Sequence, residues 1–494
     1  MLFNSFEFLV FLPIFFILYW WVFDYLIKEN KYQLLFQNLL VVAASYLFYG
    51  WWDWRFLLLI AFTSFCSFFS GMAIEKSPTK KLKSFWMILN VVVNLSMLGV
   101  YKYYDFFVTS LANCLHIDAE RHLLHLVLPV GISFYTFQAL SYSIDVYRGK
   151  LQPTRDIVSF FAFLSFFPQL VAGPIERATN LLPQFLKKRS FNYENAVDGL
   201  RQMLWGMFKK VVVADNCAVF VDTIYGNVEG YNASTLAIAA ILFSFQIYCD
   251  FSGYSDIAIG LGKLFGIKLM RNFNVPYFSR DIAEFWRRWH ISLTTWFRDY
   301  VYIPLGGSRP TNSQGLALGG LNKKIIIVRN TFIIFLLSGF WHGANWTFVL
   351  WGAFHALLFL PLILLEKNRK YTNVVAEGRL LPSFTDLFRM LSTFILAALG
   401  WIIFRADNID IAISYFARLF DYNLWGNPYL TNKVFIFLPL FIMIIIEWIH
   451  REREHGFTLE CVKNKFLRYI IYFSIAFLTV INMGPEQNFI YFQF

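Results

Sequence analysis

The sequence predicts an all-α protein that crosses a membrane about a dozen times. Hydrophobic residues make up 57% of the 494 residues, and 58 residues are phenylalanine. The apolar residues gather in runs of about 17–25 residues, the length that a helix needs to cross a bilayer of roughly 30 Å. Lysine and arginine collect between the runs, as they do in cytoplasmic loops of membrane proteins. The net charge of +11 is therefore explained by membrane topology, and we expect no nucleic-acid partner.

The apolar segments follow one another along the whole chain, without an internal repeat or a second soluble domain. We therefore expect a single membrane domain over residues 1–494, with its core motifs in 246–355. The N-terminal residues lack a basic stretch and a small-residue cleavage site, so we expect the first helix to remain as an anchor. The segments lie near residues 8–27, 33–51, 56–73, 85–105, 126–147, 157–172, 208–225, 233–260, 325–341, 346–366, 384–405, 433–449 and 466–484.

Charged loops orient these segments relative to the membrane. Lysine and arginine follow the third, sixth, tenth and twelfth segments, which places those loops in the cytoplasm, whereas loop 226–232 has neither and is predicted to be external. Segments four to six lie between two cytoplasmic loops, and three crossings cannot return to the same side. One of them must be re-entrant or broken, and Pro129 and Gly131 favour segment 126–147. We expect both termini outside and a polar interior near 129–148.

Residues 281–300 have the pattern of an amphipathic helix. Apolar residues recur there at the i, i+3, i+4 and i+7 spacing. Asp281 followed by Glu284 is typical of a helix start, and His290 lies on or beside the apolar face. One interpretation is an interfacial helix, since basic helices with tryptophan often lie at the membrane surface. The other is a wall of a functional cavity that His290 lines.

A second histidine lies between two apolar segments, 325–341 and 346–366. A helix rising from the cytoplasmic side would place His342 some 25 Å higher, at about 1.5 Å per residue. An ionisable residue in or near the membrane is a functional-site hypothesis by default. The alternative is that His342 caps a helix end. His355 lies on an apolar helix, so we expect it to pack in the core.

Polar residues interrupt the apolar segment 233–260, with Asp250 and Asp256 among them. Carboxylates inside a membrane must be paired or solvated. Three interpretations are open: the two carboxylates orient a histidine, line a water-filled cavity, or form salt bridges with arginine.

Several catalytic motifs are missing from the sequence. It contains no Walker A motif, which argues against ATP-driven transport by this chain. It contains no GxSxG motif before a helix, which argues against a serine hydrolase. Neither HExxH nor a Cys/His set is present, and none of the five cysteines forms a CxxC pair, so we expect no metal site.

Two stretches of the chain resemble the membrane-bound O-acyltransferase superfamily. They are WRRWHISLTTWFRDYVYIPLGG at 286–307 and SGFWHGANWTF at 338–348. The resemblance is closest to the membrane subunits of bacterial alginate O-acetyltransferases, whose relatives act in peptidoglycan O-acetylation and in D-alanyl transfer for teichoic acid synthesis. Further matching stretches are PVGISFYTFQALSYSIDVYRG at 129–149, FFPQLVAGPIER at 166–177 and YCDFSGYSDIAIGLGKLFGI at 248–267.

The resemblance implies a fold and a pair of catalytic residues. The fold is a ring of about a dozen transmembrane helices around a thin central region with a tunnel, together with re-entrant and cytoplasmic amphipathic helices. His342 matches the family's catalytic histidine, and His290 matches its second histidine on the cytoplasmic side. The residues that we expect to shape or orient the cavity around them are Asp250, Asp256, Ser338, Trp341 and Asn345.

The resemblance also implies the substrates and the cellular context. The donor is expected to be acetyl-CoA in the cytoplasm, with no permanently bound cofactor. The acetyl group would cross a bacterial inner membrane, among membrane lipids, to an exported polysaccharide that is alginate-like or peptidoglycan-like. A separate extracytoplasmic protein would complete the transfer. Arginine suits phosphate recognition, so Arg287, Arg288 and Arg298 are candidates for binding CoA.

Two other functions fit parts of the same pattern. The chain could be a transporter or flippase for a lipid-linked glycan, because a re-entrant segment and intramembrane carboxylates suit transport as well. It could also be a scaffold that recruits an exported acetyltransferase. A transporter would neither bind nor hydrolyse acetyl-CoA, and a scaffold would tolerate substitution of His342.

Overall fold

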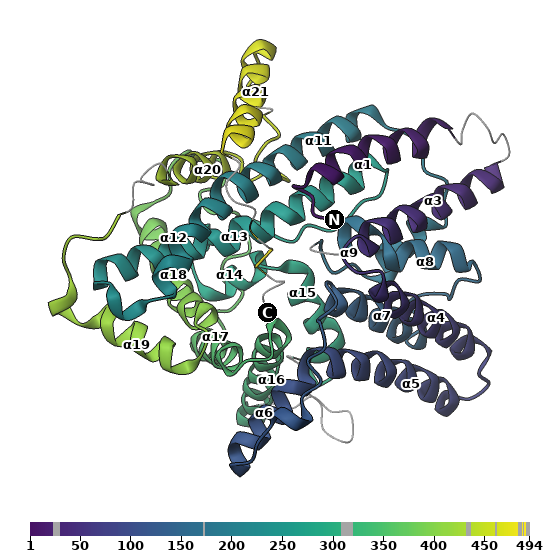
Figure 1. Ribbon diagram of the computed structural model, residues 1–494, viewed down its shortest axis with the longest axis horizontal. Coiled ribbons are helices and arrows are strands. Elements are labelled where there is room, and N and C mark those ends of the chain that lie inside the picture. The colour runs from purple at the N-terminus through teal and green to yellow at the C-terminus, as the bar shows by residue number, and fades with distance from the viewer. Residues whose placement is uncertain are drawn as a thin grey trace. The chain divides into compact units, whose positions relative to one another are not determined.

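The computed structural model describes residues 1–22, 30–170, 173–307, 320–430, 436–459, 462–482, 487 and 489–490, and every regular element within these ranges is helical (Figure 1). The prediction of an all-α protein is confirmed. The chain forms two compact units, Met1–Met203 with Ile257–Met270, and Leu204–Asp256 with Arg271–Phe494. The single membrane domain over residues 1–494 stays a prediction.

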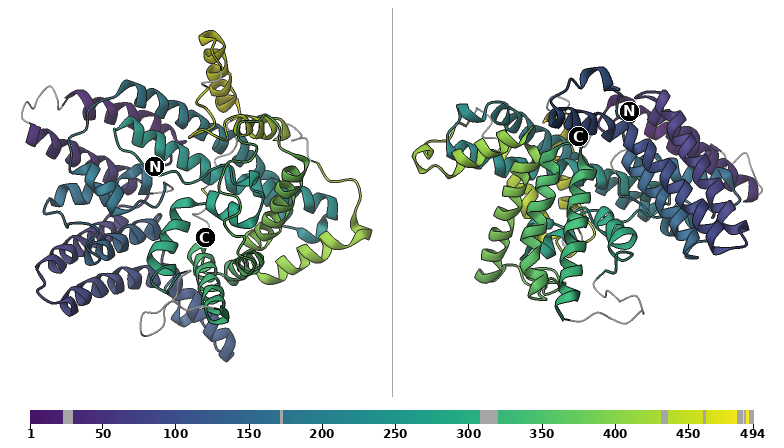
Figure 2. Two further views of the ribbon diagram at one scale, coloured as in Figure 1. Left: turned by 180° about the vertical axis from the view of Figure 1, so that it is seen from behind. Right: turned by 90° about the horizontal axis from the view of Figure 1, so that it is seen from below.

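The first unit is built from helices joined by short connections. Side-chain caps begin some of these helices: Thr79 accepts a hydrogen bond from the amide of Leu82, and Asp156 accepts from those of Val158 and Ser159. The helices are α1 (Phe6–Ile17), α3 (Asn30–Gly50), α4 (Arg55–Lys76), α5 (Lys80–Leu98), α6 (Tyr104–Leu115), α7 (Ile132–Tyr147), α8 (Ile157–Ser165), α9 (Phe167–Leu170) and α10 (Ala178–Phe185), with π-helical turns at Leu18–Val22 and Gly99–Tyr103 and a 3-10 turn at Glu120–His122. α4, α5 and α7 pack against one another, and α3 packs against α4 and α8 (Figure 2).

The second unit contains His290, His342 and His355. Its elements are a π-helix (Phe208–Ala214), α12 (Asp215–Tyr225), the 3-10 turns Val228–Gly230, η6 (Pro276–Phe278) and Tyr422–Leu424, α14 (Ile282–Arg288), α15 (Ile291–Phe297), a π-helix (Arg298–Tyr302), α16 (Gly320–His342), α17 (Trp346–Leu364), α18 (Phe384–Arg405), α19 (Ile409–Phe420), α20 (Phe437–Ile449) and α21 (Lys465–Ile481). Two boundaries between the units fall inside α11 (Tyr193–Met207) and α13 (Ala233–Leu264), and the third follows Met270 in the connection after α13. α16, α17 and α18 run side by side (Figures 1 and 2).

Glycines let α16 and α17 approach each other closely. A Cβ atom at Gly339 would collide with the carbonyl oxygen of Phe348, and a Cβ atom at Gly352 would collide with that of Phe335. Small residues at such contacts are a common device for packing helices in membranes. The tight hairpin holds His342, at the end of α16, against the first turns of α17.

Seven helices among the described residues are long and apolar enough to cross a membrane, and Phe6–Val22 and Phe437–Ile449 are shorter apolar helices. The described residues thus contain fewer full-length spans than the dozen predicted. Several predicted segments are interrupted instead of being continuous. Segment 208–225, for example, is a π-helical stretch followed by the 11-residue α12.

The predicted break near 126–147 is present, but a second segment is broken as well. Residues 123–131 are irregular, Gly131 has a φ of 73°, and α7 starts at Ile132. Segment 157–172 was expected to cross as one helix. Its first helix, α8, has only 9 residues, and Phe166, with a non-helical ψ of 106°, separates α8 from α9. At 1.5 Å per residue α8 is about 14 Å long, too short to span a bilayer.

Candidate active site

His342 is the last residue of α16 and lies in the buried interior of the second unit. Beyond it the chain turns at once, because Asn345 caps α17 by accepting a hydrogen bond from the amide of Thr347 (3.0 Å). The Asn345 amide also donates to the carbonyl of Asp407 at 2.8 Å. The residue that caps α17 is therefore Asn345, and the functional role of His342 stays a prediction.

Aromatic rings enclose the His342 imidazole. The ring centroids of Trp341, Trp351 and Phe404 lie 5.0, 5.2 and 5.3 Å from the imidazole centroid. The plane of each ring is inclined by at least 75° to the imidazole plane. Ser338, one turn earlier on α16, is buried too. The His342 ring is therefore surrounded by aromatic side chains and shielded from solvent.

The predicted continuous helix over 281–300 is wrong at one place, and that place is His290. α14 ends at Arg288, Trp289 has an extended ψ of 129°, and His290 has a left-handed φ of 43°. α15 then starts with the His290 side chain as its N-cap, accepting from the amide of Leu293. His290 thus lies at a break between two short helices and not on a helix face.

The cap indicates which nitrogen of His290 carries the proton. Nδ1 accepts the hydrogen bond from Leu293 (3.4 Å), so the proton of the neutral ring lies on Nε2. Burial lowers the pKa of His290 to about 3, so the ring is neutral at physiological pH. Nε2 is buried and has no hydrogen-bond partner among the described residues. His290 therefore offers an N–H donor to a ligand.

The structure brings the two predicted histidines to one tryptophan. The ring of Trp341 lies 5.7 Å from the His290 ring and 5.0 Å from the His342 ring, measured between centroids. The ring of Phe251 also packs against the His290 ring, with 4.7 Å between the two centroids. His355 is fully buried beside Trp286 and Trp351, which confirms its predicted place in the core.

Asp250 and Asp256 each form an ion pair with a buried lysine. Lys209 lies 2.7 Å from Asp256, and Lys210 lies 2.8 Å from Asp250. Lys210 also contacts Asp215 at 2.7 Å. Of the three interpretations of these carboxylates, pairing with a cation is the one that the structure shows.

Sequence reasoning missed Lys209 and Lys210 because they lie within a segment taken as a plain span, 208–225. The sequence itself contains a signal for this pairing. Two adjacent lysines inside an apolar run need carboxylates, just as two carboxylates inside another apolar run need cations. The ammonium of Lys209 also lies 3.8 Å from Glu447, a third carboxylate that the sequence pattern did not single out.

The three arginines predicted to bind CoA differ in their surroundings. Arg288 is buried and pairs with Glu284 at 2.9 Å. Arg287 donates to the carbonyls of Asn368 and Tyr371. Arg298 pairs with its neighbour Asp299, and 57% of its side chain is exposed. Arg298 is thus the most accessible of the three, and CoA binding by this set stays a prediction.

Comparison with known proteins identifies the family. The model described as "MBOAT, membrane-bound O-acyltransferase family" matches residues 153–397. The probable alginate O-acetylase AlgI of Pseudomonas aeruginosa is 39% identical over 86% of this chain and 76% of that protein. This chain belongs to the membrane-bound O-acyltransferase family. The peptidoglycan O-acetyltransferase of Helicobacter pylori is 33% identical over 100% of this chain and 98% of that protein. The teichoic acid D-alanyltransferase of Bacillus subtilis is 28% identical over 57% of this chain and 69% of that protein.

Family membership confirms the resemblance seen in the sequence. The chain is a membrane-bound O-acyltransferase and a multi-pass membrane protein. The matched region contains both site histidines and the lysines that pair with Asp250 and Asp256. The roles of individual residues in the O-acyltransferase site stay predictions.

Proposed function

We propose that this O-acyltransferase moves an acetyl group from cytoplasmic acetyl-CoA to an exported polysaccharide, with His342 as general base. The observation that supports the proposal best is the burial of His342 and His290 against the same ring, that of Trp341. Alginate and peptidoglycan appear in the names of two relatives, and an alginate-like acceptor is our first choice. The enzyme would act in a bacterial inner membrane with an extracytoplasmic partner protein.

The proposed reaction uses the neutral imidazole of His342. It takes the proton of an acceptor hydroxyl while that oxygen attacks the thioester carbonyl of acetyl-CoA. The C–S bond breaks, an ester forms, and the proton passes from the imidazole to the thiolate to give free CoA. Such general-base help contributes roughly 10²–10⁴ in rate. His290, with its proton on Nε2, would donate a hydrogen bond and not act as the base.

Release of CoA from radiolabelled acetyl-CoA tests the proposal. Wild-type protein in nanodiscs, supplied with its partner and with alginate or peptidoglycan oligosaccharides in separate arms, should release CoA and label one acceptor. His342→Ala should lower release at least about 100-fold, while His122→Ala, at an exposed position, should match wild type. Wild-type release by His342→Ala would remove the base assignment. Failure of the wild type to bind acetyl-CoA would remove the donor and leave the transporter alternative.

A further inference from the structure

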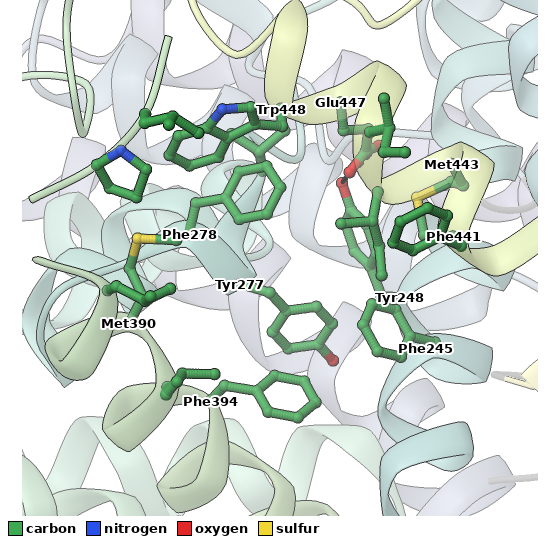
Figure 3. Close-up of a pocket in the computed structure, with 17 residues that line it drawn as sticks. Phe245, Tyr248, Tyr277, Phe278, Met390, Phe394, Phe441, Met443, Glu447 and Trp448 are labelled. Atoms are coloured by element: carbon green, nitrogen blue, oxygen red, sulfur yellow. Dashed lines mark hydrogen bonds between the residues drawn. The ribbon is translucent and has the colours of Figure 1, made fainter. Parts of the chain in front are cut away.

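A cavity of about 620 Å³ lies in the second unit, and neither site histidine lines it (Figure 3). It is bounded by α13, η6, α18 and α20. Its size falls within the range of about 300–1,000 Å³ typical of small-molecule sites. Its wall is largely hydrocarbon and aromatic, with contributions from Phe245, Tyr277, Met390, Phe394, Phe441 and Trp448.

The polar groups of the wall are bonded to the protein itself. The hydroxyl of Tyr277 donates to the carbonyl of Ser244 (2.5 Å), and the indole of Trp448 donates to that of Leu380 (2.8 Å). Tyr248 donates to the carboxylate of Glu447 at 2.9 Å. The surface presented to an occupant is therefore apolar, and water would find few partners there.

The mouth of the cavity is continuous with the lipid-facing surface. Three residues of the wall are also largely exposed: Leu381 at 74%, Phe441 at 60% and Leu391 at 53%. Leu391 lies in the candidate membrane span Phe384–Arg405, and Phe441 lies in the apolar helix α20. In a membrane protein such exposed apolar side chains face lipid chains, so lipid is the solvent at this opening.

Charge at the rim favours an anionic lipid of one leaflet. Arg379 is exposed two residues before Leu381. Its carbonyl accepts from Arg451, so Arg379 lies where the loops 367–381 and 450–459 meet, and the positive-inside rule places both loops in the cytoplasm. Arg389, one turn into α18, is already paired with Asp386 at 3.6 Å. Basic residues at this depth attract the anionic headgroups of the cytoplasmic leaflet.

We propose that this cavity binds an acyl chain of an anionic phospholipid from the cytoplasmic leaflet, with the headgroup phosphate near Arg379. The chain would fill the space between α18 and α20, and the headgroup would remain at the membrane surface. This site is separate from acetyl transfer and goes beyond the proposed function. Its wall reaches the ion pairs of the second unit, because the carboxylate of Glu447 lies 3.8 Å from the ammonium of Lys209.

Photo-cross-linking of the wild-type chain tests the site directly. The full-length protein is placed in nanodiscs that contain phosphatidylglycerol with a diazirine near the end of one acyl chain. Met390 and Met443 are buried, at 8% and 1% exposure, so they can be labelled only by a chain inside the cavity. We expect label on both after irradiation and peptide mapping. Label confined to outward residues such as Phe388 and Leu438 would overturn the proposal.

A matched pair of variants gives a second test. Met390→Trp adds bulk inside the cavity, whereas Phe388→Trp lies on the same helix with 73% exposure and does not line it. After delipidation and incubation with phosphatidylglycerol, native mass spectrometry counts the lipids retained. Wild type and Phe388→Trp should keep one lipid, and Met390→Trp should keep it at least tenfold less often. Equal retention by all three proteins, or purification with a bound lipid-linked saccharide instead, would overturn the phospholipid assignment.

Discussion

Replacing Lys209 with methionine should destabilise the second unit by an amount that the buried ion pair determines. The Lys209 side chain is 3% exposed, and its ammonium lies 2.7 Å from Asp256 and 3.8 Å from Glu447. Methionine has a similar length without the charge, so it removes a cation that lies close to both carboxylates. Removing one partner of a buried pair costs about 3–5 kcal/mol. Asp256 is 15% exposed and can be partly rehydrated, so we expect the lower end, about 3 kcal/mol.

Equilibrium unfolding in mixed micelles measures this loss. Lys80→Met, on the exposed first turn of α5, is the matched control and should stay within about 0.5 kcal/mol of wild type. Adding Asp256→Asn to Lys209→Met should recover about 1 kcal/mol, because contacting residues couple by roughly 0.5–3 kcal/mol. The reasoning fails if Lys209→Met is as stable as Lys80→Met, or if the two substitutions add without coupling.

Three other predictions concern a cap, a helix contact and a buried carboxyl. Asparagine at position 290 keeps a side-chain acceptor for the cap and tolerates left-handed backbone. The melting temperature of His290→Asn should therefore match that of wild type, while its CoA release falls. His290→Ala should lose CoA release and also about 1 kcal/mol of stability. Gly339→Ala, which meets the Phe348 carbonyl, should lower unfolding free energy by about 1–3 kcal/mol, whereas Gly99→Ala, with open space around it, should not. Burial raises the pKa of Glu176 from 4.5 to about 7. The folded state therefore holds a proton that the unfolded state loses, so the melting temperature should fall from pH 5 to pH 8 in wild type and stay level in Glu176→Gln.

Patterns local to the sequence predicted much of the fold and the family of the chain. The all-α architecture follows from the length of the apolar runs. Asn345 and His342 were singled out because glycines and polar side chains interrupt apolar sequence there. Pro129 and Gly131 correctly marked the start of α7, because both residues restrict or release the backbone locally.

Features that depend on partners far along the chain were not predicted. Lys209 pairs with Asp256, 47 positions later, and hydropathy averaged over 208–225 conceals both adjacent lysines. The short α8 resembles part of a span because 157–172 is largely apolar, although burial within protein explains that composition equally well. Hydropathy measures removal from water, and it does not distinguish a lipid contact from a protein contact.

The break at His290 is the place where local sequence rules fail most clearly, and the failure itself supports a function there. A left-handed φ of 43° is unfavourable for a residue with a side chain. It persists because Asn272 holds the following residues: its carbonyl accepts from the amide of Ile291 (2.8 Å) and its side chain accepts from the hydroxyl of Ser292 (2.9 Å). Strained residues of this kind cluster at active sites, where surrounding bonds over-determine them. A merely interfacial helix over 281–300 would run through this position unbroken. The bent backbone instead turns the His290 ring into the buried interior, where it packs against the ring of Trp341. Its Nε2 proton has no protein partner among the described residues.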